Sequence, residues 1–432
     1  MKSKTQCPAL IISAPASGQG KTTVTAAIAR KFRLQGKKVR IFKTGPDFID
    51  PFILEKASKH PVLQLDLWMA SESHCRKLLF DAAISADLIL IEGVMGLFDG
   101  DSSTADLAIK FNISVMTVID ASAMAQTFSA LAYGLMHYKT EVRSAGVFAN
   151  NIGSDYHFKL IQDALPSSIR CLGWLKRDSK NVFPERHLGL HQASEIELLD
   201  NKLSDLASLI QLHELEKIKP TTFYFDEEVT ADIQPQLKGL TIGVARDNAF
   251  SFLYYDNIHS LKELGASIIY FTPLMDTSLP PVDALYFPGG YPELYANELA
   301  SNKNMYFAIR QHYNDNKPIV AECGGMMYLS NSLSLTDGTE IPMVGVFDAN
   351  VTMQENLSAI AYQETTIDSE TIHGHTFHHS TIETDVIPFT KGLCPNGGKT
   401  NETVYRSKNL TASYIHHYFK SNLSLTATLF KS

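Results

Sequence analysis

The sequence predicts an α/β fold in two successive domains, and three observations lead to this prediction. The 432 residues exceed what one hydrophobic core usually supports, so two domains of about two hundred residues each are expected. Short apolar runs alternate with helical stretches in both halves, as in a mostly parallel sheet wrapped by helices. These runs show little polar alternation, which is typical of strands buried on both faces.

Six apolar runs in the first half are expected to form strands. Polar residues follow several of them, at the position where ligands bind in open α/β sheets. Apolar side chains then recur at near-helical spacing from Glu195 to Lys217, and an irregular stretch with two prolines runs from Lys219 to Lys238. We interpret these two segments as a last packing helix and a linker. The expected strands are Leu10–Ser13, Val39–Lys43, Leu88–Ile91, Val115–Ile119, Gly146–Ala149 and Arg170–Leu172.

A second alternating pattern follows the linker. Its apolar runs lie in TIGVARD, SIIYFTP, ALYFPGGYPE and PIVAECGG, between Thr241 and Gly325. The predicted division is therefore a first domain at residues 1–195, a packing helix with a linker at 196–238, and a second domain at 239–432.

Composition limits the classes of partner and the compartment. The net charge is −8 with no long basic run, which argues against nucleic acid or an anionic membrane surface as the main partner. The N-terminus leaves no room for an export signal, and no apolar run reaches bilayer length. Five irregularly spaced cysteines without a CxxC pair suggest neither a disulfide framework nor a zinc ribbon. We expect a cytoplasmic protein that acts on small molecules.

The string APASGQGKTT, which ends at Thr23, has the character of a phosphate-binding loop between a strand and a helix. Backbone N–H groups and the helix N-terminus would face the phosphates of ATP. Pro15 replaces the first glycine of the usual pattern, and a plain glycine turn is the alternative interpretation. The candidate nucleotide-binding residues are Gly18, Gly20, Lys21, Thr22 and Thr23, with Lys21 on the phosphate oxygens and the Thr22 hydroxyl on Mg²⁺.

Two carboxylates stand at or just past the ends of later strands, Asp47 in KTGPDFIDP and Glu92 in IEGVMGLFDG. Mg²⁺ takes one or two carboxylates together with phosphate oxygens, so the predicted metal ligands are Thr22, Asp47 and Glu92. For Asp50 and Asp99 in the same loops, a turn or helix-capping role is as well supported as contact with a ligand.

Cys323 follows the apolar strand PIVA and precedes two glycines and a helical stretch, an arrangement that favours a sharp turn and an exposed thiol. A helix N-terminus is expected to lower the pKa of such a thiol, and a buried structural cysteine is the alternative. Gly289 and Gly290 in PGGYPE provide flexible backbone for an oxyanion site. A distant histidine should act as the base, and from the residues alone His416 and His417 remain equal candidates.

The two signatures together indicate an enzyme that activates an acid with ATP and makes a nitrogen nucleophile from an amide, which is an ATP-driven amidase fed by glutamine. A P-loop ATPase switch with a C-terminal binding module is a competing interpretation. It accounts for Lys21 and Glu92, but it gives no reason for a cysteine in that turn or for PGGYPE.

The chain closely resembles the cobyrinic acid a,c-diamide synthase family, the glutamine-dependent amidases of corrinoid biosynthesis. The matching strings run almost end to end: APASGQGKTT, GPDFIDP, EGVMGLFDG, PERHLGL, ARDNAFSFLYYDN, FPGGYPEL, AECGGMMYL, GHTFHHS and ASYIHHYF. The resemblance implies a dethiobiotin-synthetase-like domain followed by a flavodoxin-like class I glutamine amidotransferase domain. It also implies a two-step reaction: ATP phosphorylates a peripheral carboxylate of the corrinoid macrocycle, and ammonia then displaces the phosphate to give an amide. The reaction takes place at the c and a positions of the macrocycle.

The resemblance places the family's nucleophile on Cys323 and its activating histidine on His416. The wider class usually carries a glutamate two residues after this histidine, where this chain has Tyr418. The family string GHEFHyS reads GHTFHHS here, with Thr376 where glutamate is common. A metal site at the histidines of this segment is an alternative that the family does not support.

A cationic stretch, RDSKNVFPERHLGLHQ, suits a substrate rich in carboxylates, and Arg186 and His187 are the candidate substrate contacts there. Lys43 is a third candidate, for phosphate or substrate. Related enzymes share these motifs, so metal-free hydrogenobyrinic acid and nickel-sirohydrochlorin stay open as substrates. Sequence does not fix the oligomeric state, and a homodimer is left open.

Overall fold

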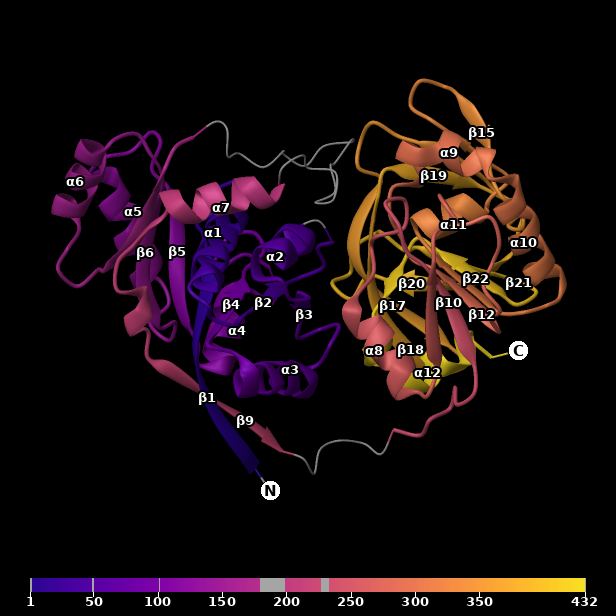
Figure 1. Cartoon of the computed structure of the whole chain (residues 1–432), viewed down its shortest axis with the longest axis horizontal. Helices are drawn as coiled ribbons and strands as arrows, with labels where there is room; N and C mark the ends of the chain where they lie inside the picture. Colours follow the sequence, from indigo (N-terminus) through magenta and orange to yellow (C-terminus); the bar gives the residue numbers. More distant parts are fainter. Residues whose placement is uncertain (1, 49, 101, 179–198, 227–232, 432) are drawn as a thin grey trace. The chain divides into compact units, whose positions relative to one another are not determined.

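The computed structural model describes residues 2–48, 50–100, 102–178, 199–226 and 233–431. The chain forms two compact units, and each is an α/β unit as predicted (Figure 1). The first holds the elements from β1 to β9, and the second holds the elements from β10 to the last helix.

The first unit is built on a sheet in the order β3-β2-β4-β1-β5-β6-β7-β8. Along this order the strands are parallel except for β8, which is antiparallel to β7, and all six predicted strands are present. The bounds are β1 (Lys2–Ser13), β2 (Val39–Thr44), β3 (Leu63–Leu65), β4 (Leu88–Glu92), β5 (Ser114–Asp120), β6 (Ser144–Ile152), β7 (Cys171–Lys176) and β8 (Gln211–Leu212).

Helices cover this sheet and share its apolar cores. The helices are α1 (Lys21–Leu34), α2 (Asp50–Ser58), α3 (Glu72–Ser85), α4 (Thr104–Phe111), α5 (Thr127–His137), α6 (Asp155–Ala164) and α7 (Leu199–Leu209). One core joins α1, α2 and α7 to β1, β2 and β4, and a second joins α5 and α6 to β5 and β6. The side chains of Ser71, Ser103 and Ser154 cap α3, α4 and α6 by accepting a hydrogen bond from a backbone amide three residues on.

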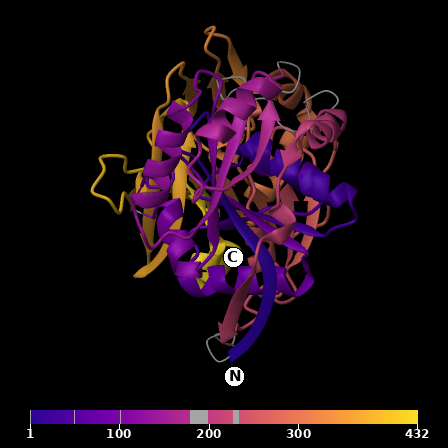
Figure 2. The same cartoon turned by 90° about the vertical axis from the view of Figure 1, so that its left-hand side faces the viewer.

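The predicted packing helix is present as α7, but the stretch that follows it is not irregular throughout. A short 3₁₀ turn, η2 (Leu215–Lys217), leads into β9 (Pro220–Asp226), which pairs antiparallel with β1 (Figure 2). The run TTFYF is rich in β-branched and aromatic residues, and Pro220 takes the first position, where a strand tolerates proline. The expected linker was therefore wrong for residues 220–226, while the division at 195 and 238 stays a prediction.

The second unit contains five parallel strands in the order β11-β10-β12-β13-β22, which is the flavodoxin-like order. Antiparallel strands continue the sheet in the order β21-β20-β17-β18-β23. The strands are β10 (Thr241–Ala245), β11 (Ser267–Phe271), β12 (Ala284–Phe287), β13 (Ile319–Glu322), β17 (Ala359–Ile367), β18 (Glu370–His378), β20 (Pro388–Leu393), β21 (Thr403–Ser407), β22 (Leu410–Ser413) and β23 (His416–His417).

Two apolar cores lie against this second sheet. One includes α8 (Tyr255–Glu263) and α12 (Leu423–Leu429), and the other includes α9 (Ala296–Ser301), α10 (Lys303–Asn314) and α11 (Gly324–Leu329). Short 3₁₀ turns lie at η4 (Pro292–Tyr295) and η5 (Phe419–Ser421). A small sheet in the order β15-β14-β16-β19 adds β14 (Ser332–Ser334), β15 (Glu340–Pro342), β16 (Asn350–Met353) and β19 (Ser380–Glu383).

None of the helices in the described ranges has both the length and the apolar character needed to cross a bilayer.

Candidate active site

The loop between β1 and α1 has the backbone geometry of a phosphate cradle. Gly20 has φ 86°, and a Cβ at this position would lie 2.1 Å from Nδ2 of Asn150, so only glycine fits. Asn150 in turn donates from Nδ2 to the carbonyl of Gln19 at 2.9 Å, which ties the loop to β6. Gly18 also has a positive φ, of 78°. The strand, loop and helix are in place although Pro15 replaces the first glycine.

Lys21, Thr22 and Thr23 form the first turn of α1, where backbone N–H groups lack partners within the helix. The ammonium of Lys21 donates to the carbonyls of Met95 at 2.6 Å and Ala16 at 3.3 Å. These contacts fold the lysine over its own loop, close to where phosphate oxygens would bind.

Three carboxylates converge on Lys43, whose ammonium is buried near the end of β2. Its Nζ lies 2.6 Å from Oδ2 of Asp50, 2.6 Å from Oε1 of Glu92 and 3.3 Å from Oδ2 of Asp47. The Thr22 hydroxyl donates to the same Oε1 of Glu92 at 2.8 Å. The structure thus brings together Thr22, Asp47 and Glu92, the three predicted metal ligands.

The chemistry of these side chains suits a magnesium ion, although the three carboxylates surround the Lys43 ammonium and form no metal-binding group by themselves among the described residues. Oε2 of Glu92 is buried and has no hydrogen-bond partner among the described residues. The donor set is a hydroxyl and carboxylates, the hard oxygen ligands that Mg²⁺ prefers. The Lys43 ammonium already places one positive charge among these carboxylates, so the site is arranged around a cation.

The structure gives different roles to Asp50 and Asp99, which the sequence left open. Asp99 accepts a hydrogen bond at Oδ2 from the backbone N–H of Gly96 at 2.9 Å, which is a turn role. Asp50 begins α2 and pairs with Lys43, so it belongs to the carboxylate group around that lysine.

Cys323 lies on a strained turn between β13 and α11, with φ 46° and ψ −111°. The two glycines after it allow close packing: a Cβ on Gly324 would lie 2.8 Å from Cδ of Pro292, and one on Gly325 would lie 2.3 Å from the carbonyl oxygen of Phe287. Only glycine therefore lets the helix start directly beneath the thiol, as in a nucleophile elbow.

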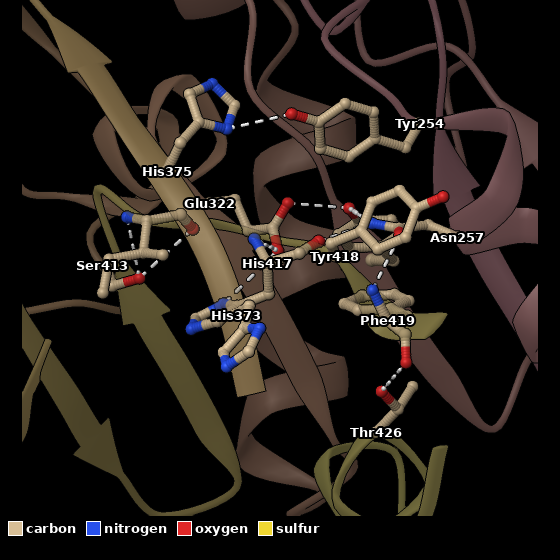
Figure 3. Close-up of polar contacts among 12 residues, drawn as sticks. Tyr254, Asn257, Glu322, His373, His375, Ser413, His417, Tyr418, Phe419 and Thr426 are labelled. Carbon is tan, nitrogen blue, oxygen red and sulfur yellow. Dashed lines mark hydrogen bonds and ion pairs between the residues drawn. The ribbon is translucent and has the colours of Figure 1, made fainter. Parts of the chain in front are cut away.

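His416 and Cys323 meet at Gly289. A Cβ on Gly289 would lie 2.2 Å from Cε1 of His416 and 3.3 Å from Cβ of Cys323. His417 faces elsewhere: its backbone N–H donates to Oε1 of Glu322 at 3.0 Å, and its Nδ1 lies 3.5 Å from the same oxygen (Figure 3). Successive residues of a strand point to opposite faces, so the geometry brings His416 to the thiol and directs His417 away.

The glycine pair that we expected to stabilise an oxyanion borders the elbow. The backbone nitrogen of Gly290 lies 2.9 Å from the position that a Cβ on Gly324 would take, and a Cβ on Gly290 would lie 2.0 Å from the carbonyl of Ala249. The backbone of both glycines therefore runs close beside Cys323, where N–H groups can stabilise negative charge on a carbonyl oxygen.

Cys323 is buried, with 4% of the residue exposed, so the expectation of an exposed thiol was wrong. Burial also shifts the pKa values of Cys323 and His416. It raises the pKa of the Cys323 thiol, and the nearby Glu293 carboxylate adds to this effect. Burial, followed by the charges of His375, His378 and His417, holds the pKa of His416 well below its usual value. The helix N-terminus was expected to lower the thiol pKa, and that expectation was wrong because desolvation is the larger effect. Both shifts favour the neutral thiol and the neutral imidazole.

The segment around Thr376 has a structural role that the sequence did not reveal. The Thr376 hydroxyl donates to Oε1 of Glu402 at 3.2 Å, and Nε2 of His378 lies 3.0 Å from the same oxygen. Glu402 thus brings a carboxylate to the residue that replaces the family's glutamate. Among the described residues, no group of three or more histidine, cysteine, aspartate and glutamate side chains is arranged to hold a metal ion.

Arg186 and His187 lie outside the described residues. Sequence reasoning missed three side chains of the second unit that contact Cys323, His416 or their neighbours: His375, Tyr254 and Glu402. The string GHTFHHS pointed to the first. Tyr254 lies in the family string ARDNAFSFLYYDN, but that string assigns it no role, and Glu402 lies in none of the matching strings and reaches the site only through the fold.

Two protein-family models match the chain. Residues 10–189 match the CobQ/CobB/MinD/ParA nucleotide binding domain, and residues 241–423 match the CobB/CobQ-like glutamine amidotransferase domain. A solved glutamine amidotransferase aligns with 44% of this chain and 96% of its own at 16% identity, with a TM-score of 0.32, which is too low to add support.

Curated relatives match over almost the full length. The hydrogenobyrinate a,c-diamide synthases of Pseudomonas aeruginosa and Stutzerimonas stutzeri are 50% and 52% identical, over 98% of this chain and 97% and 99% of their own. The cobyrinate a,c-diamide synthase of Herminiimonas arsenicoxydans is 43% identical, over 98% of this chain and 96% of its own.

Proposed function

The chain belongs to the cobyrinate and hydrogenobyrinate a,c-diamide synthase family, and from this premise we propose that it amidates the a and c carboxylates of a corrin-type polyacid. The reaction uses ATP and glutamine and belongs to cobalamin biosynthesis. The resemblance to the family predicts cobyrinic acid as the substrate, with hydrogenobyrinic acid and nickel-sirohydrochlorin as alternatives. The relatives at 50% and 52% identity are named for hydrogenobyrinate, which favours the metal-free macrocycle as the substrate.

The nucleotide-binding unit has the task of turning a poor leaving group into a good one. A carboxylate is inert to ammonia until its oxygen is phosphorylated by ATP, after which ammonia displaces phosphate and leaves an amide. Lys21 and the amides of the Gly18–Thr23 loop are arranged to bind the phosphates. Thr22, Asp47 and Glu92 would hold Mg²⁺, which neutralises the charge of the phosphate oxygens when bound.

The glutamine amidotransferase unit supplies the ammonia. As His416 accepts the thiol proton, the sulfur of Cys323 attacks the side-chain amide carbon of glutamine, and Gly289 and Gly290 border the oxyanion that forms. His416 returns the proton to the leaving nitrogen, so ammonia departs and a thioester remains. Water hydrolyses the thioester and releases glutamate.

A cytoplasmic location is part of this proposal. All five cysteines are free thiols, as is usual in a reducing compartment, and two of the substrates are ATP and glutamine.

The observation that carries the proposal is the meeting of Cys323 and His416 at Gly289, on a chain that also has a phosphate-binding loop. The test incubates the purified protein with ATP, Mg²⁺, glutamine and, separately, hydrogenobyrinic acid, cobyrinic acid or nickel-sirohydrochlorin. Mass spectrometry should show replacement of two OH groups by NH₂ on one or both of the first two. If ATP hydrolysis is unaffected by glutamine and no amide forms on any macrocycle, the alternative of a P-loop ATPase switch replaces this function.

A further inference from the structure

The activating histidine has an unusual neighbour at the position where the wider class places a glutamate. That residue is Tyr418, and its hydroxyl donates to Oδ2 of Asp256 on α8. Its ring packs edge-on against Tyr254, with centroids 5.3 Å apart and planes at 75°. Tyr418 therefore connects to α8 and Tyr254, and the third member of a triad has to be sought elsewhere.

Two carboxylates whose charges act on Cys323 are bound to other groups. Glu322 accepts from the Tyr286 hydroxyl at 2.7 Å and from the backbone N–H of His417 at 3.0 Å. Glu402 accepts from the Thr376 hydroxyl at 3.2 Å and lies 3.0 Å from His378. These hydrogen bonds fix the Glu322 and Glu402 carboxylates to groups other than His416.

His375 stacks on His416. The two residues are register partners on β18 and β23, and their ring centroids are 5.0 Å apart with planes at 17°. Nδ1 of His375 shares a hydrogen bond of 2.9 Å with the hydroxyl of Tyr254, which precedes α8 (Figure 3). The side chains are buried, with 3% of His375, 4% of Tyr254 and 1% of His416 exposed.

This arrangement restricts the orientation of the His416 ring. A parallel ring on one side limits rotation about the terminal torsion of a histidine, which is otherwise broad. The bond to Tyr254 fixes the stacking ring in turn, and Tyr254 is itself braced by Tyr418, which is bound to Asp256. Gly289 also leaves room for the imidazole only because it has no side chain, since a Cβ there would lie 2.2 Å from Cε1 of His416.

We propose that His375, held by Tyr254, is the positioning residue for His416 and replaces the carboxylate that orients the base in the wider class. It sets the plane of the imidazole toward Cys323 by stacking, and it does not take part in the proton transfer. The inference rests on the proposed function, because it concerns the glutamine half of that reaction.

The test measures glutamine hydrolysis and ammonia-driven amidation separately in three variants. His375→Ala removes the stacking ring, His375→Asn keeps a polar partner for Tyr254, and Tyr254→Phe keeps the ring and removes the hydroxyl. A misplaced catalytic group costs about 10²-fold in rate, so kcat for glutamine should fall by about that factor in His375→Ala, with KM changed little. Tyr254→Phe should show a smaller fall, and His375→Asn should recover part of the rate.

His373→Ala is the matched control, since it removes a histidine from the same strand, β18. Nε2 of His373 lies 3.8 Å from Oε2 of Glu364. This control should keep the parent kcat, and all variants should keep ammonia-driven amidation. A His375→Ala enzyme with the kcat of this control would overturn the inference, as would a change confined to KM. Tyr254→Phe with the parent kcat would overturn the role of the hydroxyl even if His375→Ala failed to fold. Failure of the proposed function is distinct, because the parent protein itself would then release no glutamate.

Discussion

Gly289→Ala is the substitution whose effect the structure defines most sharply. The added methyl group would lie 2.2 Å from Cε1 and 3.1 Å from Nδ1 of His416, where ordinary contact begins at 3.4 Å. The imidazole therefore has to move by more than one ångström, away from Gly289 and from its position beside Cys323. Such a displacement costs about 10²-fold, and complete loss of a general base costs about 10²–10⁴-fold. We expect kcat for glutamine hydrolysis to fall within this range, which corresponds to about 3–5 kcal/mol in activation free energy.

The assay follows glutamate release and amide formation, first with glutamine and then with ammonium salts. Gly289→Ala should lose the first and keep the second, because the nucleotide-binding unit does not depend on this contact. Gly134→Ala is the control: a Cβ at this position in α5 meets nothing within 4 Å, so both activities should persist. A Gly289→Ala enzyme that hydrolyses glutamine within a few-fold of the parent would refute the assignment of His416 as the base. An equal loss of both activities would indicate a folding defect and no specific role.

The remaining predictions address both units. Cys323→Ala should abolish glutamine-driven amidation and retain the ammonia-driven reaction, whereas Lys21→Ala should lower both by at least about 10²-fold; loss of both in the cysteine variant contradicts the proposed division of tasks. Lys43→Met leaves buried carboxylates without their cation, so the free energy of unfolding measured without Mg²⁺ should fall by about 3–5 kcal/mol. Added Mg²⁺ should raise the melting temperature of this variant more than that of the parent. A melting temperature that Mg²⁺ leaves unchanged argues against a magnesium site at these carboxylates. Burial raises the pKa of Glu293 from 4.5 to about 7, so its contribution to stability is full below pH 4.5 and lost as pH rises through about 7. Glu293→Gln should therefore have a larger free energy of unfolding than the parent at pH 8, by no more than about 3 kcal/mol, and the difference should vanish near pH 4.5. A difference that stays constant across this range would show that titration of Glu293 does not cause it.

The parts of the fold that the sequence predicted are those encoded locally. Runs such as Leu88–Ile91 are buried on both faces and read as strands without any knowledge of their neighbours. The turn at Cys323 could also be predicted from the sequence, because a strand, a cysteine and two glycines are contiguous. β9 was missed because two prolines suggested an irregular stretch, whereas its partner β1 lies more than two hundred residues away and supplies the pairing.

The parts of the site that the sequence did not predict depend on long-range contacts. His375 reaches His416 through strand pairing, and Tyr254 reaches His375 from the start of a helix that is 121 residues away in sequence. The raised pKa of the Cys323 thiol could not be read from its helix N-terminus, because the depth of burial is a property of the whole unit. The choice between His416 and His417 needed Gly289, whose contacts show which ring faces the thiol.

The most direct test of coupled activation and ammonia supply counts three products in one incubation of the purified protein with hydrogenobyrinic acid, ATP, Mg²⁺ and glutamine. Glutamate, ADP and new amide groups should appear in equal amounts, until each macrocycle carries two amides. Formation of ADP with macrocycle and glutamine present, but without glutamate and without an amide, would contradict the account.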